Sequence, residues 1–257
     1  MALWIACRSC SPVRPPEPPT SPHLSVLTFN LDVDAPDKES ALNTIEQSGA
    51  DVVCVQEATP AWERALRERL GNRYRYVSFV HPANQYGGAG VLSRFPLGDE
   101  KWLPPAGGGW FPSQLVQVQT PLGKIQFLNV HLRPPSTNDG SKVLGYFTTG
   151  SVRREEIGQI LSHLDSGLPA IVLGDFNEGD GGSAVSLVRA RGLSDCLSQF
   201  DRHTATWHSR GGLIRLAERA DHILYTPQLH CTGAKVIPQS SSDHDPVAAD
   251  LGLARPQ

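Results

Sequence analysis

The sequence predicts a mixed-sheet α/β sandwich, on the strength of two observations. From Leu24 onward, apolar runs of strand length alternate with amphipathic stretches of helical length. In the middle of the chain, predicted strands follow one another directly instead of alternating with helices. A doubly wound parallel sheet needs a helix between successive strands, so this pattern favours packed mixed sheets with helices between only some of the strands.

The positions of strands and helices follow from the hydrophobic periodicity of the chain. Strands are expected at residues 24–29, 51–56, 90–93, 115–119, 125–132, 170–173, 223–225 and 247–251. Helices are expected at residues 37–48, 59–71 and 151–166, and in a short segment that Ser183 caps. The runs at 51–56 and 170–173 are almost entirely apolar, which is typical of strands that are buried on both faces.

Composition restricts the class of protein. The chain has 257 residues, 39% hydrophobic and 19% charged, so it is long and apolar enough to fold as one large domain. Its 23 basic and 26 acidic residues give a net charge of −3, which excludes a strongly basic nucleic-acid-binding coat but not a local basic groove. No run of about 18 apolar residues exists, so no transmembrane helix is expected. Five scattered cysteines argue against a disulfide framework, and Cys54 is expected in the core.

We expect residues 1–22 to form a flexible tail and residues 23–257 to form a single folded domain. Six prolines lie in the second half of the tail, which favours a polyproline spacer. Cys7 and Cys10 form a lone CxxC, for which a solvated tail is the alternative to a zinc or redox site. The triplet ending at Cys7 resembles the end of a bacterial lipoprotein signal. Two locations therefore stay open: the cytoplasm, or a lipoprotein outside the cytoplasmic membrane if translation starts upstream.

Polar side chains follow several predicted strands at the point where each strand ends. They are Asn30 and Asp32, Glu57, His131, and Asp175 and Asn177. Near the end of the chain, Asp221 lies beside a predicted strand, and Asp243 and His244 come later. Because the carboxyl ends of neighbouring strands in an α/β sheet converge on one crevice, we expect these side chains to share one site. Taken singly, each has an ordinary explanation as a turn, a helix cap or a solvated loop. Independent turns do not explain the whole series.

This set of residues indicates a particular chemistry. Hard oxygen ligands without thiolates suit Mg²⁺, Mn²⁺ or Ca²⁺. Two histidines beside carboxylates suit phosphate binding and proton transfer, and asparagine amides can donate to phosphate oxygens without adding repelling charge. The set fits metal-assisted hydrolysis of a phosphate ester. No GxSxG or HExxH motif occurs, which argues against a serine hydrolase and a zinc hydrolase of those types.

Six short motifs, in their order along the chain, resemble those of the endonuclease/exonuclease/phosphatase superfamily, also called the deoxyribonuclease I-like fold. They are Thr28-Phe29-Asn30, Val55-Gln56-Glu57, Asn129-Val130-His131-Leu132, Gly174-Asp175-Phe176-Asn177, Ala220-Asp221-His222-Ile223 and Ser242-Asp243-His244-Asp245-Pro246. The resemblance, to a bacterial-type member, covers nearly all of the chain after the tail. It implies a four-layer α/β/β/α sandwich of two packed mixed sheets flanked by helices, with residues 23–257 as the catalytic domain.

The resemblance also implies a role for each site residue. A Mg²⁺ or Mn²⁺ ion would be held chiefly by Glu57, with Asn30, Asp32 and Asp243 as further candidate ligands. The catalytic candidates are Asp175 to orient or deprotonate the attacking water, Asn177 and His131 to bind the phosphate, His244 to bind or protonate it, and Asp221 to fix the His244 tautomer.

The substrate is less well indicated, because the fold and the catalytic set are shared by enzymes that act on different phosphoesters. The loops at residues 81–90, 104–113 and 133–150 are the expected selectors, and Arg133 and Trp207 are candidate substrate contacts. A nuclease-like phosphodiesterase is favoured. A sphingomyelinase-like or inositol-phosphate phosphoesterase is the alternative, followed by a non-catalytic binding module on the same fold. The expected partner is a phosphate ester, with nucleic acid, lipid and small molecules all open, and we expect a monomer without an obligate protein partner.

Overall fold

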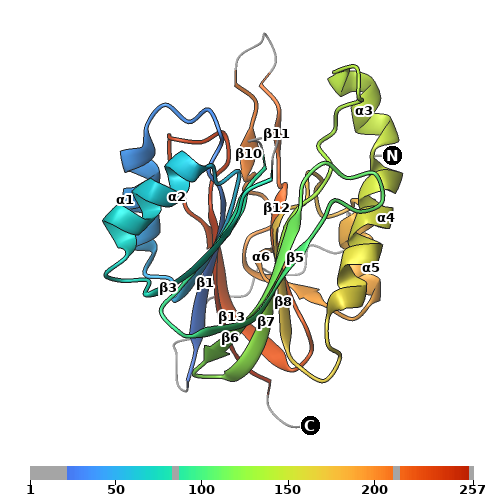
Figure 1. Ribbon diagram of the computed structural model, residues 1–257. Helices are drawn as coiled ribbons and strands as arrows, with labels where there is room; N and C mark the ends of the chain where they lie inside the picture. The colour runs from blue at the N-terminus through green and yellow to red at the C-terminus, as the bar shows by residue number, and fades with distance from the viewer. Residues whose placement is uncertain (1–21, 83–86, 211–214, 255–257) are drawn as a thin grey trace, which may run out of the picture.

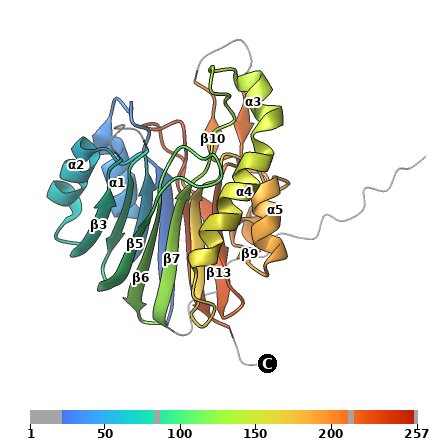
Figure 2. The ribbon, with the colours of Figure 1, turned by 45° about the vertical axis from the view of Figure 1, so that its right-hand side comes forward.

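A computed structural model confirms the sandwich. It contains two six-stranded sheets packed face to face, with helices on both outer faces (Figure 1). The structure describes residues 22–82, 87–210 and 215–254. Helices α1 and α2 cover the first sheet, and α4 and α5 lie across the second (Figure 2). The layers therefore run helix, sheet, sheet, helix, as the resemblance implies.

The first sheet has the strand order β13-β14-β1-β2-β4-β3. Its strands are β13 (Leu229–Val236), β14 (Val247–Leu253), β1 (Leu24–Asn30), β2 (Val52–Gln56), β4 (Ala89–Ser93) and β3 (Tyr76–Val80). Strands β1 and β2 are parallel, whereas the other neighbours are antiparallel. The two parallel strands therefore end at the same edge of the sheet.

The second sheet has the order β5-β6-β7-β8-β12-β9. Its strands are β5 (Leu97–Leu103), β6 (Ser113–Thr120), β7 (Gly123–His131), β8 (Ala170–Asp175), β12 (Asp221–Tyr225) and β9 (Ser194–Asp195). Here β7 and β8 are the parallel pair. A separate two-stranded hairpin, β10 (Trp207–His208) and β11 (Ala217–Glu218), stands at one end of the sandwich, at the top of Figure 1.

The helices begin and end where local sequence signals place them. They are α1 (Lys38–Ser48), α2 (Pro60–Leu70), α3 (Lys142–Thr148), α4 (Gly150–Ile160), α5 (Ser183–Ala190) and α6 (Leu197–Phe200), with a 3-10 turn at Leu161–His163. The Asp37 side chain caps α1, and Gly49 ends it with φ 74°. Thr59 caps α2, with Pro60 in its first turn.

Three apolar cores hold the four layers together, and the strands divide their side chains between them by simple alternation. On β1 and β2, Val26 and Cys54 point between the two sheets. Their neighbours Leu27 and Val55 point outward and pack under α1 and α2. The third core fills the space between the second sheet and α4 and α5. This explains why residues 51–56 form an apolar run, since both faces of β2 are covered.

Buried amides join the two sheets next to the ends of the parallel strands. The Gln56 Nε2 atom donates to Asn129 Oδ1 at 2.7 Å. The Asn129 amide in turn donates to the carbonyls of Val55 (3.1 Å) and Gly90 (3.2 Å). Gln56 and Asn129 are both fully buried, so the donors and acceptors satisfy one another. This bridge sets how β7 lies against β2.

Several expectations about elements need correction. The helix expected at residues 151–166 ends at Ile160, because the chain turns there toward β8 and the Gln126 side chain holds the backbone of Asp165. Ser183 does not cap α5: Gly182 is the capping position, and the amides of Ala184 and Val185 donate to the Glu178 carboxylate. Residues 133–150 are not only a loop, because they include α3.

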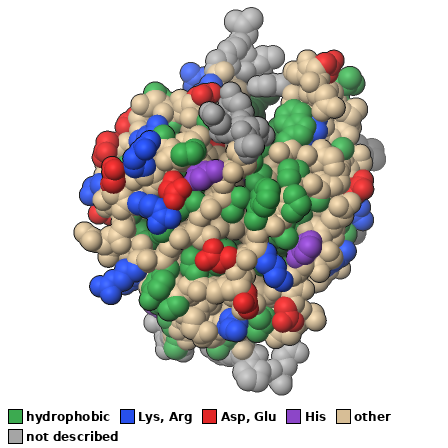
Figure 3. Space-filling model, in the orientation of Figure 1, with side chains coloured by type: hydrophobic (Ala, Val, Ile, Leu, Met, Phe, Trp, Pro, Cys, Tyr) green, Lys and Arg blue, Asp and Glu red, His purple; other side chains and the backbone are tan. Residues whose placement is uncertain are grey.

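The cysteines and the surface agree with the composition. Cys54, Cys196 and Cys231 are free thiols buried in the core, whereas Cys7, Cys10 and the rest of the tail lie outside the described residues. On the face shown in Figure 3, Lys and Arg side chains are interspersed with Asp and Glu rather than gathered into a basic stripe. Among the described residues, no helix is long and apolar enough to cross a bilayer.

Gly174 is a point at which the fold tolerates no side chain. Its φ is 140°, and a Cβ atom there would lie 1.9 Å from the Val130 carbonyl oxygen on β7. We expect Gly174→Ala to lower the free energy of unfolding by about 3 kcal/mol or more, because it adds both a clash and backbone strain. Chemical denaturation measures this. Gly98→Ala is the control, since nothing lies within 4 Å of a Cβ at Gly98, and equal stability of the two variants would contradict the argument.

Candidate active site

The sheet register brings most of the predicted site residues to one end of the sandwich. Asn30 on β1 lies beside Gln56, which directly precedes Glu57. On the second sheet, His131 is paired with Asp175, and Asp175 is paired with Asp221. The parallel pairs β1–β2 and β7–β8 therefore end together, as the sequence predicts.

Asn30 connects the two sheets within this site. Its side-chain amide donates to Glu57 Oε1 at 3.1 Å and to Asp175 Oδ2 at 3.1 Å. The Asn30 side-chain oxygen accepts from the backbone N–H of Asp32 at 3.1 Å. One neutral side chain thus bridges two carboxylates that belong to different sheets, which reduces their mutual repulsion without adding charge.

Asp175 is the centre of the cluster and is 1% exposed. The backbone N–H of Asn177 donates to its Oδ1 atom at 2.8 Å, and the Asn177 amide reaches Oδ2 at 3.3 Å. The Nε2 atoms of His131 and His244 lie 3.5 and 3.6 Å from the same Oδ2 atom. Burial raises the pKa of Asp175, and the positive charge of His244 offsets part of that rise.

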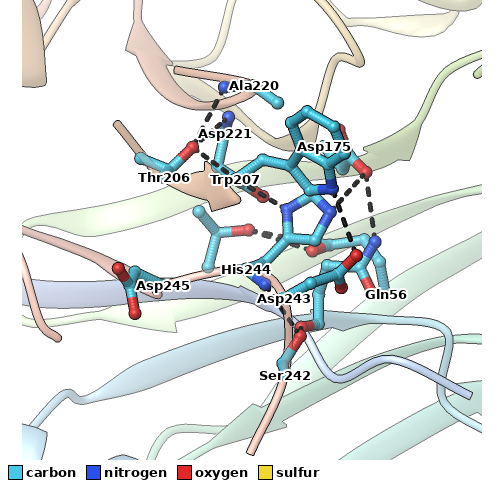
Figure 4. A network of polar contacts seen from close by, with 12 residues as sticks. Gln56, Asp175, Thr206, Trp207, Ala220, Asp221, Ser242, Asp243, His244 and Asp245 are labelled. Atoms are coloured by element: carbon cyan, nitrogen blue, oxygen red, sulfur yellow. Dashed lines mark hydrogen bonds and ion pairs between the residues drawn. The ribbon is translucent and has the colours of Figure 1, made fainter. Parts of the chain in front are cut away.

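His244 is held as a cation between two carboxylates (Figure 4). Its Nδ1 atom lies 2.8 Å from Asp221 Oδ2, which also accepts from the Thr206 hydroxyl at 2.7 Å. Burial lowers the pKa of His244, but the charges of Asp221 and Asp175 outweigh that effect and raise the pKa to about 10. His244 is therefore protonated at neutral pH and can donate from Nε2.

His131 is the opposite case. Burial lowers its pKa to about 4, an effect that the charge of Asp175 only partly offsets. The Phe111 ring stacks on the imidazole, with centroids 3.9 Å apart and planes 20° apart. The buried Nδ1 atom has no hydrogen-bond partner among the described residues. The site therefore pairs a neutral histidine with a charged one, on two sides of the same carboxylate.

Three of the site residues have left-handed backbones that non-glycine residues rarely adopt. The φ angles are 58° at Asp32, 56° at Glu57 and 51° at Asn177. Each such residue costs about 1–3 kcal/mol unless the surroundings hold it. The side chains that hold these turns are themselves in the site: Asn30 accepts from the Asp32 N–H and Asp175 from the Asn177 N–H.

Glu57 fits a hard divalent cation. Its carboxylate is partly exposed and receives hydrogen bonds from Asn30 and from the Val33 N–H (2.8 Å). Burial raises its pKa, and among the described residues no Lys or Arg forms an ion pair with it. The charge of His244 and these hydrogen bonds offset only part of the cost of desolvating this carboxylate, so a metal ion would stabilise it further.

The other expected ligands are placed differently. Both Asp32 oxygens already have donors: the Asp34 N–H donates to Oδ1 (2.9 Å), and the Arg210 guanidinium donates to Oδ2. The Oδ2 atom of Asp243 accepts from the Trp207 indole at 3.1 Å. The structure also contains a buried group whose ligand atoms lie within 4.8 Å of one another and could hold an ion: Asp175, Asp221 and His244.

The structure places the two candidate substrate contacts in different settings. Trp207 is half-buried beside the site, where it forms a β-bridge with His244. Arg133 is 7% exposed, and its guanidinium donates to the Gly108 and Ser136 carbonyls and lies 3.6 Å from the centre of the Trp110 ring. Arg133 therefore links two loops, and few of its N–H groups remain available to bind a substrate.

Sequence reasoning missed three residues that contact the site. Thr206 donates to Asp221 and accepts from the backbone N–H groups of Ala220 and Asp221, each at 3.0 Å. Phe111 covers His131, and Arg210 pairs with Asp32. All three lie in loops or in the β10–β11 hairpin, far along the chain from the residues they contact. The only available signals were a Gly-Gly-Gly-Trp-Phe run and the aromatic residue that follows Thr206.

Solved structures share this fold. An endonuclease/exonuclease/phosphatase from Beutenbergia cavernae has a TM-score of 0.70 and 23% identity over 91% of this chain and 72% of its own. D. rerio TDP2 complexed with a single-strand DNA product has a TM-score of 0.69 and 17% identity over 90% and 99% of the two chains. ANGEL2, a 2′,3′-cyclic phosphatase, has a TM-score of 0.69 and 17% identity over 90% and 96%. No curated protein sequence matches the chain.

The sequence itself also matches a family model. The model describes the Endonuclease/Exonuclease/phosphatase family, and the match runs from residue 27 to residue 244. It contains all six motifs up to His244 and spans both sheets. The chain therefore belongs to the endonuclease/exonuclease/phosphatase family.

Proposed function

We propose that this protein is a divalent-metal-dependent phosphodiesterase with nuclease-like activity. Its family consists of phosphoesterases, so the coarse reaction class is hydrolysis of a phosphoric ester. One observation carries the finer proposal: the buried Asp175 carboxylate lies within 3.6 Å of both His131 and His244 and is linked through Asn30 to Glu57. This arrangement supplies a base, an acid and an amide donor around one small space.

The charged states of the site residues suit the hydrolysis of a phosphodiester. Asp175, with a pKa raised by burial, can accept a proton from an attacking water. His244, protonated, can donate to a phosphate oxygen or to the leaving group, and Asp221 keeps its Nδ1–H oriented. Neutral His131 and the Asn177 amide can donate hydrogen bonds to non-bridging oxygens. The proton on His244 then stays available for transfer.

A metal ion would complete the charge balance of the site. Members of this family are typically dependent on a divalent metal, and Glu57 is the ligand that the chemistry of the site favours, followed by Asn30, Asp32 and Asp243. Mg²⁺ or Mn²⁺ held there would neutralise charge on the phosphate. For the substrate we favour a nucleic-acid strand, because the similar D. rerio TDP2 was solved with a single-strand DNA product.

Hydrolysis of bis-p-nitrophenyl phosphate tests the proposed function. We expect turnover with Mg²⁺ or Mn²⁺ and none with EDTA. His244→Ala should lower kcat by about 100-fold or more, because it removes the proton donor. His244→Gln, which keeps a hydrogen-bonding side chain in the network, guards against a misfolded alanine variant. A folded His244 variant with full activity would contradict the assignment, and so would equal turnover with and without metal.

Glu57→Gln tests the metal site without any need for activity. We expect MgCl₂ or MnCl₂ to raise the Tm of the wild-type protein, since a ligand that binds only the folded state stabilises it. Glu57→Gln has nearly the same shape and keeps one acceptor oxygen but removes the charge, so the rise in Tm should be lost. If His244→Gln loses the rise and Glu57→Gln keeps it, the ion is bound by the Asp175, Asp221 and His244 group instead.

The raised pKa of His244 can be measured by NMR titration of the metal-free protein. Because the folded-state pKa of about 10 exceeds the ordinary value, the stability it contributes is complete below pH 6.5 and is lost as the pH rises toward 10. We expect Asp221→Asn to lower this pKa by more than about one unit. Asp195→Asn is the matched control, because Asp195 lies 2.7 Å from His222 and should affect that histidine alone. An unchanged His244 pKa in Asp221→Asn would refute the coupling.

A further inference from the structure

An arginine at the mouth of the site has no role in the chemistry proposed above. Arg210 lies in the segment that follows β10, and its side chain is 46% exposed. Its Nη1 atom donates to Asp32 Oδ2, and its Nη2 atom donates to the Ser241 carbonyl oxygen at 3.1 Å. The guanidinium thus joins the loop after β1 to the loop that carries His244.

These two contacts fix the guanidinium while leaving part of it available. Arginine has five N–H donors in a rigid plane, and the two hydrogen bonds occupy only some of them. Because the anchors are an acidic side chain and a backbone carbonyl of two separate loops, the plane is oriented before any ligand binds. A cation that is already oriented loses little conformational entropy when it binds an anion.

Arg210 differs in this respect from the other arginines near the site. Arg133, Arg153 and Arg219 are 7%, 4% and 8% exposed. Their guanidinium groups donate to backbone carbonyls and, for Arg153 and Arg219, to carboxylates within the fold, so they stabilise the fold. Among the described arginines that contact the site or its loops, Arg210 is the one with a substantially exposed guanidinium.

The charges at the site explain why such a cation matters. The site contains five carboxylates, those of Asp32, Glu57, Asp175, Asp221 and Asp243. The charge of a substrate with one phosphate would be neutralised by His244 and by a metal ion held at Glu57. A second phosphate next to the scissile one would meet acidic side chains at the mouth unless a cation received it.

We propose that Arg210 is a specificity-determining residue that contacts a phosphate neighbouring the scissile one, so that the enzyme selects nucleic-acid strands over isolated phosphodiesters. The half-buried indole of Trp207, three residues earlier in the same hairpin, supports a strand as the substrate. Proteins hold single strands with cations that follow the backbone and aromatic rings on which bases stack. The inference rests on the proposed phosphodiesterase activity and names its substrate class.

Two substrates, one with and one without phosphates next to the scissile one, test this proposal. One is a single-stranded 12-nucleotide DNA, and the other is a dinucleoside monophosphate, which has one phosphate and two bases. We expect the wild-type enzyme to prefer the 12-mer in kcat/KM. Arg210→Gln should reduce that preference about tenfold, mainly through KM, and should reduce the salt dependence of 12-mer cleavage by about one phosphate contact. Arg210→Lys, which keeps the charge but not the planar fork, should have an intermediate effect.

Arg94→Gln is the matched control. Arg94 is 49% exposed and pairs with an aspartate, Asp51, at 2.7 Å, but it lies at the opposite end of the first sheet. Its substitution should leave both substrates unaffected. If Arg210→Gln lowers kcat for both substrates in proportion, Arg210 only fastens the two loops, and the proposal is wrong. If the wild type cleaves bis-p-nitrophenyl phosphate but neither nucleotide substrate, the phosphodiesterase assignment stands and this inference fails.

Discussion

The buried amide bridge between Gln56 and Asn129 is the contact on which the geometry of the site depends. Gln56 directly precedes Glu57, and Asn129 lies two residues before His131. An unsatisfied amide in the dry space between two sheets would cost about 1–3 kcal/mol, so neither sheet can slide along the other without breaking the bridge. Apolar side chains alone pack without directional preference. The bridge therefore fixes the alignment that lets Asn30 of one sheet bond Asp175 of the other.

The Asp175 carboxylate lies between one neutral histidine and one positively charged histidine. His131 is stacked against Phe111, and its Nδ1 atom has no acidic partner in the described part of the chain, so desolvation keeps it neutral. His244 has Asp221 on one nitrogen and faces Asp175 with the other, so the ion pairs outweigh desolvation. In the proposed reaction, an acid and a neutral donor would lie on either side of one base, and their different environments would separate their functions.

The parts of this site that follow buried strands could be predicted from the sequence, and the parts in loops could not. Glu57 and Asp175 come directly after apolar runs, and a run of that kind ends at a known edge of a sheet. Thr206 and Phe111 reach the site from loops whose paths depend on tertiary packing, and no local periodicity predicts those paths.

Strand β13 was missed for a related reason, because a bulge between Cys231 and Gly233 interrupts its pattern. Cap residues were more informative: Asp37 and Thr59 mark helix starts by a local interaction that the sequence alone specifies.

The hydroxyl of Ser242 donates to the carbonyl of Asn30 at 2.8 Å, across 212 residues of chain. Strand β1 likewise lies between β2 and β14, so its two neighbours come from distant parts of the sequence. During synthesis, β1 must therefore wait for almost all of the polypeptide to leave the ribosome before one of its edges can pair. A nascent or truncated chain that lacks residues 241–253 would have Glu57 and Asp175 but no His244, no Ser242 contact and an open strand edge. The full set of site residues can therefore come together only once the polypeptide has emerged through this last segment.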